Sequence, residues 1–251
     1  MDAALCRDRQ SPTDLLEGFA VIMGAIGDQG IPGEQTPLID PAFSDRIVAR
    51  CAALRRLDRA APWLARGPSA PGTEQEWVAT GRPNWLPPRV VTPGRDAFHE
   101  VAAAVGDAVP LGPVRGGLFT CTTVAAGPGM WRAYLRAQGE NVLWPKPWHL
   151  WRMRPAPDAT IHHVSSAQAW TALVYEHHYR AGGLLHPDWS KIANIADAVH
   201  VAPAAVCSID GLRLSTDLGP IAPTYWTVES TFWLRWRFDE DFGAVYIGAA
   251  E

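Results

Sequence analysis

The segment from Tyr225 to Phe238 constrains the fold most, because its composition is that of a β-strand. Its residues are almost all aromatic, β-branched or alternating in polarity, which favours a pleated, half-buried surface. Alternation along a strand places Glu229 and Trp226 on opposite faces. A glutamate surrounded by aromatic side chains must be hydrogen-bonded, ion-paired or functional. Glu229 is therefore the first candidate functional residue, with a salt bridge to Arg235 or another arginine as the structural alternative.

Helix signals dominate the first third of the chain. Ser11 and Asp40 each precede a proline and a run with helical spacing of apolar residues, as at the start of many helices. We expect residues 1–81 to form an all-helical N-terminal layer, which includes a short helix over residues 74–80. The Pro-rich stretch that follows places the boundary near residue 82, so residues 82–251 are expected to form the main α/β core.

Strand and helix signals are interspersed in the expected core. Strands are predicted over residues 89–92, 117–123, 148–154, 160–164, around Val199 and over 225–238. Helices are predicted over residues 95–105 and 130–137, from a cap at Ser165 to Tyr179, and after 186–189. The fold class is therefore α/β in the broad sense, of the α+β type.

Composition favours a folded, cytoplasmic protein. Hydrophobic residues make up 47% of the chain and charged residues 19%, which is typical of globular domains. No apolar run reaches the roughly 20 residues that cross a bilayer, and the first residues carry charges of both signs, unlike a secretory signal. The net charge of −4 gives no overall attraction to nucleic acid. Lysine accounts for only two of 22 basic residues, a bias that suggests a GC-rich bacterium or its phage.

Several site classes lack their sequence signatures. The four cysteines are dispersed, which disfavours zinc and disulfide frameworks. The histidines at 162–163 and 177–178 are adjacent in sequence and so point apart, which disfavours a metal site. No glycine-rich dinucleotide fingerprint after a strand, phosphate loop or nucleophile elbow is present. We therefore expect no metal and none of the corresponding dehydrogenase, NTPase or α/β-hydrolase activities.

Two further features could carry chemistry. In the predicted strand after Gly116, Thr120 and Thr122 point the same way, so their hydroxyl groups can orient a polar ligand. Arg89 begins the first predicted core strand, where a guanidinium group can grip a phosphate through paired hydrogen bonds. A Thr-rich strand after a glycine turn and a solvent-exposed arginine are the structural alternatives.

Taken in order, these features resemble the ADP-ribosyltransferase superfamily, in its arginine, serine-threonine-serine, glutamate class. In that family the arginine contacts the dinucleotide phosphates, the hydroxyl motif shapes the NAD pocket, and the glutamate holds the nicotinamide ribose. The resemblance assigns these roles to Arg89, to Thr120 and Thr122 within Phe119-Thr-Cys-Thr, and to Glu229. It implies a mixed, mainly antiparallel, split β-sheet core with helices.

The resemblance spans about residues 86–238 and has two departures. Phe119-Thr-Cys-Thr stands where the family usually has Ser-Thr-Ser. Thr227 stands two positions before the glutamate, where many members carry Glu or Gln, so the acceptor specificity is open. Residues 117–122, 128–132 and 229–236 also resemble small uncharacterised proteins of actinobacteria and their phages.

The resemblance implies a mono-ADP-ribosyltransferase with NAD as substrate and Glu229 as its catalytic residue. It implies that Phe119 and Trp226 line the nicotinamide pocket and that Arg89, Thr120 and Glu229 converge on one cleft. The acceptor can be a protein side chain, a nucleic-acid base or a small molecule. Two alternatives remain: an NAD glycohydrolase, in which water replaces the acceptor, and a noncatalytic interaction protein with a Trp-rich binding face.

Overall fold

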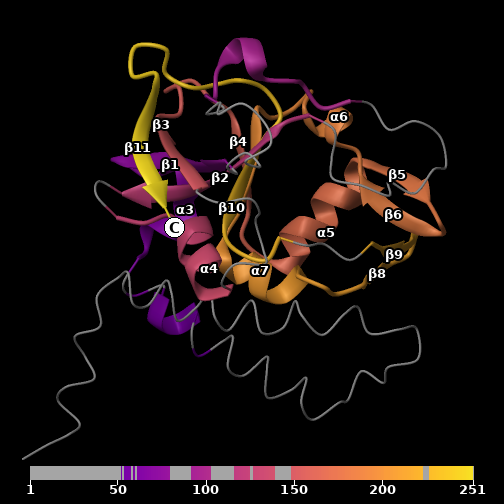
Figure 1. The fold of residues 1–251 in the computed structure, drawn as a ribbon. Coiled ribbons are helices and arrows are strands. Elements are labelled where there is room, and N and C mark those ends of the chain that lie inside the picture. The colour runs from indigo at the N-terminus through magenta and orange to yellow at the C-terminus, as the bar shows by residue number, and fades with distance from the viewer. Residues whose placement is uncertain are drawn as a thin grey trace, which may run out of the picture.

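The computed structural model describes most of the chain after residue 60. The described residues are 61–79, 92–102, 116–124, 127–138, 148–222 and 226–250, together with Ala52, residues 54–57 and Arg59. Within them the chain has an α+β fold, in which two β-sheets are connected and covered by helices (Figure 1). The predicted fold class, with a mixed and mainly antiparallel sheet, is confirmed.

The larger sheet has seven strands in the order β11-β3-β1-β2-β10-β7-β4. All neighbouring strands are antiparallel except β4 and β7, which are parallel at one edge. The strands are β1 (Thr73–Ala79), β2 (Leu118–Val124), β3 (Trp148–Met153), β4 (Ile161–Val164), β7 (Ala198–Val201), β10 (Ser230–Trp233) and β11 (Ala244–Ala250). The centre of this sheet therefore joins segments from both halves of the chain.

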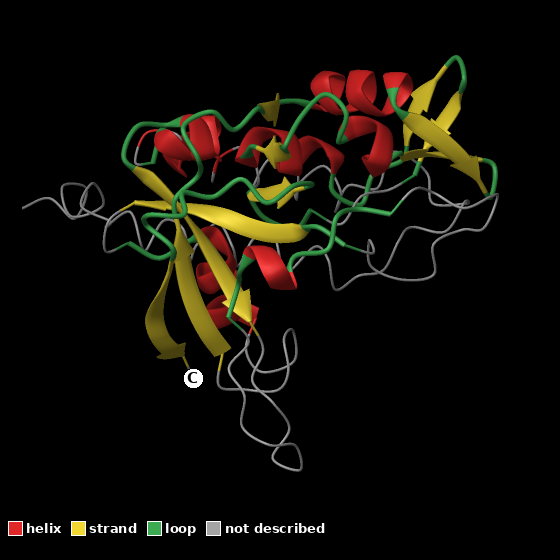
Figure 2. Cartoon of the chain, turned by 90° about the horizontal axis from the view of Figure 1, so that it is seen from above, coloured by secondary structure: helices red, strands yellow, loops and turns green. Residues whose placement is uncertain are grey.

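The smaller sheet has four strands in the order β5-β6-β9-β8. Its strands are β5 (His178–Ala181), β6 (Leu184–Pro187), β8 (Leu214–Thr216) and β9 (Gly219–Ile221). Helix α5 (Ala167–Glu176) contacts β4 of the larger sheet and β6 and β8 of the smaller one, so it connects the two (Figures 1 and 2). The Ser166 side chain caps this helix by accepting a hydrogen bond from Ala169 N–H.

The remaining helical segments are short. They are α3 (Trp63–Arg66), η1 (Gly67–Ser69), η2 (Arg95–Ala97), α4 (Met130–Gln138), α6 (Trp189–Ile192) and α7 (Pro203–Ile209). Helix α4 packs on β2, α7 packs on α5, and η1 contacts β1 and β2. No helix among the described residues has the length and apolar character needed to span a bilayer.

The two faces of the larger sheet differ in polarity. On one face Cys121, Val199 and Phe232 are fully buried in the main hydrophobic cluster, together with apolar residues of α4, α5 and α7. The other face carries buried threonines and His200 in its central strands. Because buried polar groups need hydrogen-bond partners, the side chains on this second face are candidates for a functional site.

The expected all-helical N-terminal region is wrong at residues 73–79. These residues form β1, which pairs with β2 on one side and with β3 on the other. Glu, Gln and Ala favour helices in isolation, but pairing on both sides of a central strand overrides that weak preference. The boundary near residue 82 therefore does not separate helices from the sheet. Residues 1–51 lie outside the described part of the chain.

The helix predicted over residues 95–105 is also wrong through residue 102. Only the short turn η2 forms, and residues 98–102 are not helical. Tertiary contacts account for this, because the Phe98 ring packs against Trp236 at 5.9 Å and the His99 carbonyl accepts a hydrogen bond from Gly117 N–H. The strand predicted over 89–92 falls outside the described residues, apart from Thr92.

The strand predicted over residues 225–238 is shorter than expected. Only Ser230–Trp233 form β10, and Glu229 precedes it directly. The N–H groups of Leu234 and Arg235 bond to the Asp197 carbonyl instead of continuing the ladder. Helix α5 ends at Glu176 because the next residues enter β5, and its cap is Ser166 rather than the predicted Ser165. The predicted β2, α4, β3, β4 and β7 are confirmed.

Candidate functional site

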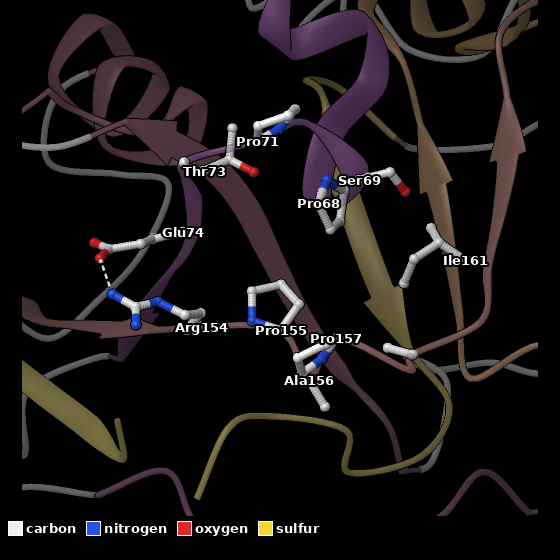
Figure 3. A pocket seen from close by; sticks show the side chains of 12 residues that line it. Pro68, Ser69, Pro71, Thr73, Glu74, Arg154, Pro155, Ala156, Pro157 and Ile161 are labelled. Atoms are coloured by element: carbon white, nitrogen blue, oxygen red, sulfur yellow. Dashed lines mark ion pairs between the residues drawn. The ribbon is translucent and has the colours of Figure 1, made fainter. Parts of the chain in front are cut away.

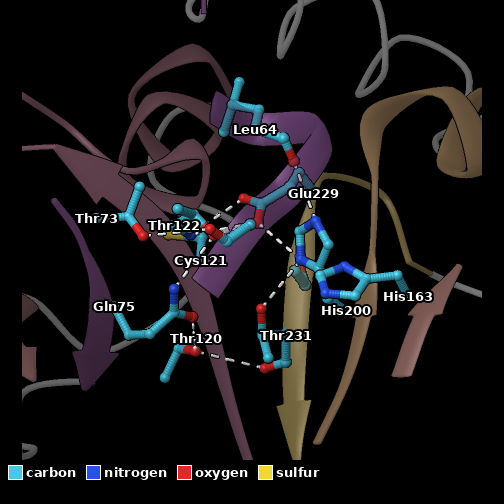
Figure 4. A network of polar contacts seen from close by, with 12 residues as sticks. Leu64, Thr73, Gln75, Thr120, Cys121, Thr122, His163, His200, Glu229 and Thr231 are labelled. Carbon is cyan, nitrogen blue, oxygen red and sulfur yellow. Dashed lines mark hydrogen bonds and ion pairs between the residues drawn. The ribbon is translucent and has the colours of Figure 1, made fainter. Parts of the chain in front are cut away.

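The predicted threonines and glutamate come together because β10 pairs with β2. In this antiparallel pair Thr231 lies opposite Thr120. Glu229 precedes Thr231 by two residues, so it comes opposite Thr122 on the same face. All four residues are 0% exposed. We refer to the following side chains as the buried polar network: Gln75, Thr120, Thr122, His200, Glu229, Thr231 and Trp233. Figure 4 labels all of them except Trp233.

The Glu229 carboxyl group is held by Thr122. The Thr122 hydroxyl donates to Oε1 at 2.8 Å, and the Thr122 backbone N–H lies 3.3 and 3.2 Å from the two carboxyl oxygens. These residues are 107 positions apart in the sequence. A single residue of β2 therefore fixes the orientation of the carboxyl group.

His200 approaches Glu229 from β7. Its Nδ1 lies 3.3 Å from Glu229 Oε1 and 3.1 Å from the Thr231 hydroxyl, and its Nε2 lies 3.0 Å from the Leu64 carbonyl oxygen. Because a carbonyl only accepts, Nε2 must donate, and in a neutral ring Nδ1 then accepts. Burial and the nearby His163 lower the pKa of His200 to about 3. His200 is therefore neutral at physiological pH.

Complete burial raises the pKa of Glu229 to about 8, although the hydrogen bonds from Thr122 oppose this shift. The carboxyl group is therefore mainly protonated at neutral pH. A protonated Oε1 can donate to His200 Nδ1, which makes the pair a neutral hydrogen bond and not an ion pair. The site holds a proton that an exposed glutamate would have released.

Gln75 connects the two threonines and was missed by the sequence analysis. Its side-chain NH₂ donates to the Thr122 hydroxyl at 3.2 Å, and its carbonyl accepts from the Thr120 hydroxyl at 2.6 Å. Thr120 in turn accepts from the indole N–H of Trp233 at 2.9 Å. Gln75 was placed in a predicted helix, where no strand pairing with Thr122 was foreseen.

His200 was also missed, although the sequence contains a signal for it. It lies within the otherwise apolar run around Val199, where a polar side chain requires a partner as much as Glu229 does. Both residues are polar side chains in buried strands, and the structure joins them at 3.3 Å. A search for isolated polar residues in apolar strands identifies both.

The chain covers this network closely at Gly67. Gly67 has a φ of 52°, and a Cβ atom built there would collide with the His200 ring. The neighbouring Leu64 supplies the carbonyl that accepts from His200. The end of α3 and the start of η1 therefore cover the His200 end of the network, with a glycine where no side chain fits.

Phe119 and Trp226 do not face this network. The Phe119 ring stacks on Phe232 at 4.3 Å and meets Trp226 edge-on at 5.6 Å. Phe232 and Trp226 belong to the main hydrophobic cluster on the opposite face of the sheet, and Phe119 is 40% exposed there. The predicted site residues are thus divided between the two faces.

Arg89 lies outside the described residues, so its expected convergence with Thr120 and Glu229 stays a prediction. The proposed salt bridge between Glu229 and Arg235 is wrong. Arg235 is 43% exposed and lies 3.5 Å from Asp197. Within the described part of the chain, the ionisable side chain that pairs with Glu229 is the neutral His200, at 3.3 Å.

A Trp-rich binding face is not formed by the aromatic segment. Trp226 and Trp233 are buried at 6% and 0% exposure. Trp236 is half-buried and packs against Phe98 and Phe238. These tryptophans pack in the core, so they do not form the exposed Trp-rich face that a noncatalytic interaction protein would need.

A second buried carboxylate lies on the opposite face of the sheet. Glu76 of β1 is 0% exposed, accepts a hydrogen bond from Gly129 N–H at 3.2 Å and pairs with Arg132 of α4 at 2.9 Å. Burial raises the pKa of Glu76, but the positive charge of Arg132 opposes this. Unlike Glu229, Glu76 has a cationic partner.

A cavity of about 580 Å³ opens beside the network. Ser69 of η1 lines one side of it, and Glu74 and Arg154 lie on the other side, with Thr73 next to Glu74 (Figure 3). Thr73 occupies the same face of β1 as Gln75, two residues away. Glu229 does not line this cavity.

Comparisons with family models, curated proteins and solved structures found no match for this chain. Among the described residues, no cluster of three or more His, Cys, Asp or Glu side chains is arranged to hold a metal ion.

Proposed function

We propose that the chain cleaves the nicotinamide–ribose bond of NAD and transfers ADP-ribose to an acceptor. The observation that carries this proposal is the 2.8 Å hydrogen bond from the Thr122 hydroxyl to Glu229. It joins the hydroxyl motif of an early core strand to the glutamate of a late strand, which are two of the three elements on which the resemblance to ADP-ribosyltransferases rests.

The chemistry requires a carboxylate beside the ribose. The bond between C1′ and nicotinamide breaks with its electron pair passing to the nicotinamide ring, which leaves as a neutral molecule. The ribose becomes oxocarbenium-like, and an anionic Glu229 stabilises that charge or binds a ribose hydroxyl. The acceptor then attacks C1′ and releases its proton.

The charge of Glu229 has a direct consequence for the pH dependence. Because the pKa of the buried carboxyl group is raised to about 8, the empty site is mainly protonated at pH 7. A cationic nicotinamide ring placed beside it favours the ionised form and lowers this pKa. We expect kcat/KM for NAD to rise with pH up to about 8, since this parameter reports the free enzyme.

Burial sets a second requirement. Glu229 is 0% exposed, and Leu64 and Gly67 cover the His200 end of the network. NAD can reach the carboxyl group only if residues that bury it are displaced. Binding energy from the rest of the dinucleotide must therefore provide the free energy of opening.

Incubation of the full chain with NAD, while nicotinamide release is measured, tests the reaction before any acceptor is known. The Glu229→Gln variant keeps the shape of the side chain and loses its negative charge, so release should fall by roughly 10²–10³-fold. Glu74→Gln is the matched control: it changes a partly buried carboxylate of β1 that pairs only at 3.7 and 3.9 Å. Its rate should remain that of the parent.

Product analysis separates the two acceptor classes. Free ADP-ribose as the sole product identifies water as the acceptor and hence a glycohydrolase. ADP-ribose attached to added protein or nucleic acid identifies a transferase. Absence of both NAD binding and nicotinamide release in the folded chain would refute the proposal.

A further inference from the structure

A serine and a histidine meet at the wall of the cavity. Ser69 ends η1, and its Oγ lies 2.8 Å from Nε2 of His163 in β4. Ser69 also lines the cavity of about 580 Å³, a volume typical of small-molecule sites. A hydroxyl group and an imidazole within hydrogen-bond distance, next to a cavity, have the arrangement of a nucleophile and its base.

The backbone around Ser69 is held in place. Pro68 and Pro71 lie on either side of Ser69, and the ring of each proline fixes its own backbone φ angle. The Thr73 hydroxyl donates to the carbonyl of Ala70 at 2.7 Å and lies 3.2 Å from that of Gly67. A hydroxyl on such a rigid turn keeps its position toward His163, which reduces the entropy cost of reaching a reactive geometry.

His163 is suited to accept the serine proton. Burial lowers its pKa, so the ring is neutral at physiological pH. Its ring meets the His200 ring edge-on, with centroids 5.5 Å apart, which restricts its orientation. In the tautomer with its proton on Nδ1, Nε2 accepts the hydrogen bond from Ser69.

The walls of the cavity indicate its ligand. Most are apolar, because Pro155, Ala156, Pro157, Ala159 and Ile161 line it. The far end is charged, as Figure 3 shows for Glu74 and Arg154.

Among the described residues that meet at that end, two guanidinium groups face one carboxylate. Glu74 lies 3.7 Å from Arg154 and 3.9 Å from Arg152, so one carboxylate is shared between two guanidinium groups. Arg154 is 50% exposed and can turn toward a ligand. A second carboxylate, supplied by a ligand, is therefore favoured at this end.

We propose that Ser69 and His163 form a nucleophilic dyad that hydrolyses esters whose acyl chain ends in a carboxylate. Ser69 Oγ attacks the carbonyl carbon as its proton passes to His163 Nε2. The bond to the alcohol breaks, and His163 returns the proton to the departing oxygen. Water then attacks the acyl group on Ser69, gives its proton to His163, and releases the acid as Ser69 recovers its proton. This activity is separate from NAD cleavage and uses no reacting group of it.

The test uses the full chain with two ester probes of similar length. Mono-p-nitrophenyl glutarate carries a terminal carboxylate, and p-nitrophenyl valerate does not. We expect faster p-nitrophenol release from the glutarate, and a fluorophosphonate probe should add to Ser69, as located by peptide mass spectrometry. Arg154→Gln should lower hydrolysis of the glutarate more than hydrolysis of the valerate and so reduce the preference for the glutarate.

Matched variants identify the reacting groups. Ser69→Ala should abolish the adduct, and His163→Asn should lower the rate by about 10²–10⁴-fold. Ser215→Ala changes a serine that lines another cavity, and His162→Asn changes the neighbour of His163 that points to the opposite face, so both should keep the parental rate. A folded parent chain without a Ser69 adduct, or an unchanged rate in Ser69→Ala, overturns the proposal.

Discussion

Glu229 and His200 link the folding of this chain to pH in opposite directions. Burial raises the pKa of Glu229 from 4.5 to about 8, so between these values the folded chain retains a proton that the unfolded chain releases. Stability contributed by this group is full below pH 4.5 and is lost as pH rises toward 8. Burial lowers the pKa of His200 from 6.5 to about 3, so its contribution is full above pH 6.5 and is lost as pH falls toward 3.

The first prediction is that Glu229→Gln removes the alkaline side of this dependence. An amide cannot ionise, and its NH₂ can donate to His200 while its carbonyl accepts from Thr122. The free energy of unfolding of the variant, relative to the parent, should therefore increase from pH 4.5 to about 8 and then level off. Each unit of pKa difference corresponds to about 1.4 kcal/mol, so a gain of several kcal/mol is expected. Urea unfolding at a series of pH values measures it.

The matched control is His200→Gln, which should flatten only the acid side of the profile, between about pH 3 and 6.5. A Glu229→Gln variant that is destabilised equally at every pH would contradict the assignment. That result would instead indicate an ionised Glu229 that depends on a cation.

The second prediction concerns Gly67. Its φ of 52° is unfavourable for other residues, and an added Cβ would collide with the His200 ring. Gly72 has a φ of 72°, but nothing lies within 4 Å of the Cβ position. Gly72→Ala should therefore cost about 1 kcal/mol, and Gly67→Ala at least about 2 kcal/mol more through overpacking. Equal melting temperatures for the two variants would contradict this prediction, because they would show that the segment around Gly67 moves away from His200 without a loss of stability.

At the scale of the elements, β1 shows where sequence-based reasoning ends. The strands β2, β3, β4 and β7 are rich in β-branched or aromatic residues, and their local signal is enough to predict them. In β1 the run Thr73-Glu-Gln-Glu-Trp-Val-Ala favours a helix locally and becomes a strand only because two partners flank it. Pairing between distant segments cannot be predicted from the local sequence, so the position of Gln75 beside Thr120 and Thr122 was missed.

The candidate site follows the same division. The contact between Glu229 and Thr122 agrees with the expectation that both elements converge, because each residue stood out within its own strand. Phe119 and Trp226 were assigned to the same pocket, but strand alternation places Phe119 on the face opposite Thr120. The sequence predicts which face of a strand each residue occupies, but it does not predict which helices pack on that face.

The third prediction tests how α4 is attached to β1. Glu76 is fully buried and pairs with Arg132 of α4 at 2.9 Å, so Glu76→Gln leaves a guanidinium group without its counter-charge. The expected loss is about 3–5 kcal/mol, as for other buried pairs. Glu74→Gln, two residues earlier on the same face of the strand, breaks only longer and more exposed pairs and should cost less than about 1 kcal/mol. Thermal unfolding of both variants measures the difference, and similar losses would refute it.

At the scale of the whole molecule, β10 determines when the larger sheet is complete. It lies between β2 and β7, and without it the sheet divides into one group with β11, β3, β1 and β2 and another with β7 and β4. Joining them requires contacts between residues more than a hundred positions apart.

The fourth prediction is that the two groups become protected together. In refolding followed by pulsed hydrogen exchange, the amides of Thr120, Phe232 and Val199 should gain protection in one phase, because β10 bonds to both neighbours. Contacts of this sequence separation form slowly, so this phase should follow the protection of α5. Protection of Thr120 well before Phe232 would contradict this order.

The late position of β10 in the chain also has a consequence for synthesis. A ribosome releases β1 to β7 before it releases residues 230–233, so β2 and β7 emerge with a row of unpaired backbone groups. Both edges are flanked by buried apolar residues, and they remain open until nearly the whole chain has been translated. The open strand edges of two nascent chains on neighbouring ribosomes can instead pair with each other. Slow translation before residue 230 should therefore increase co-aggregation of the newly made protein.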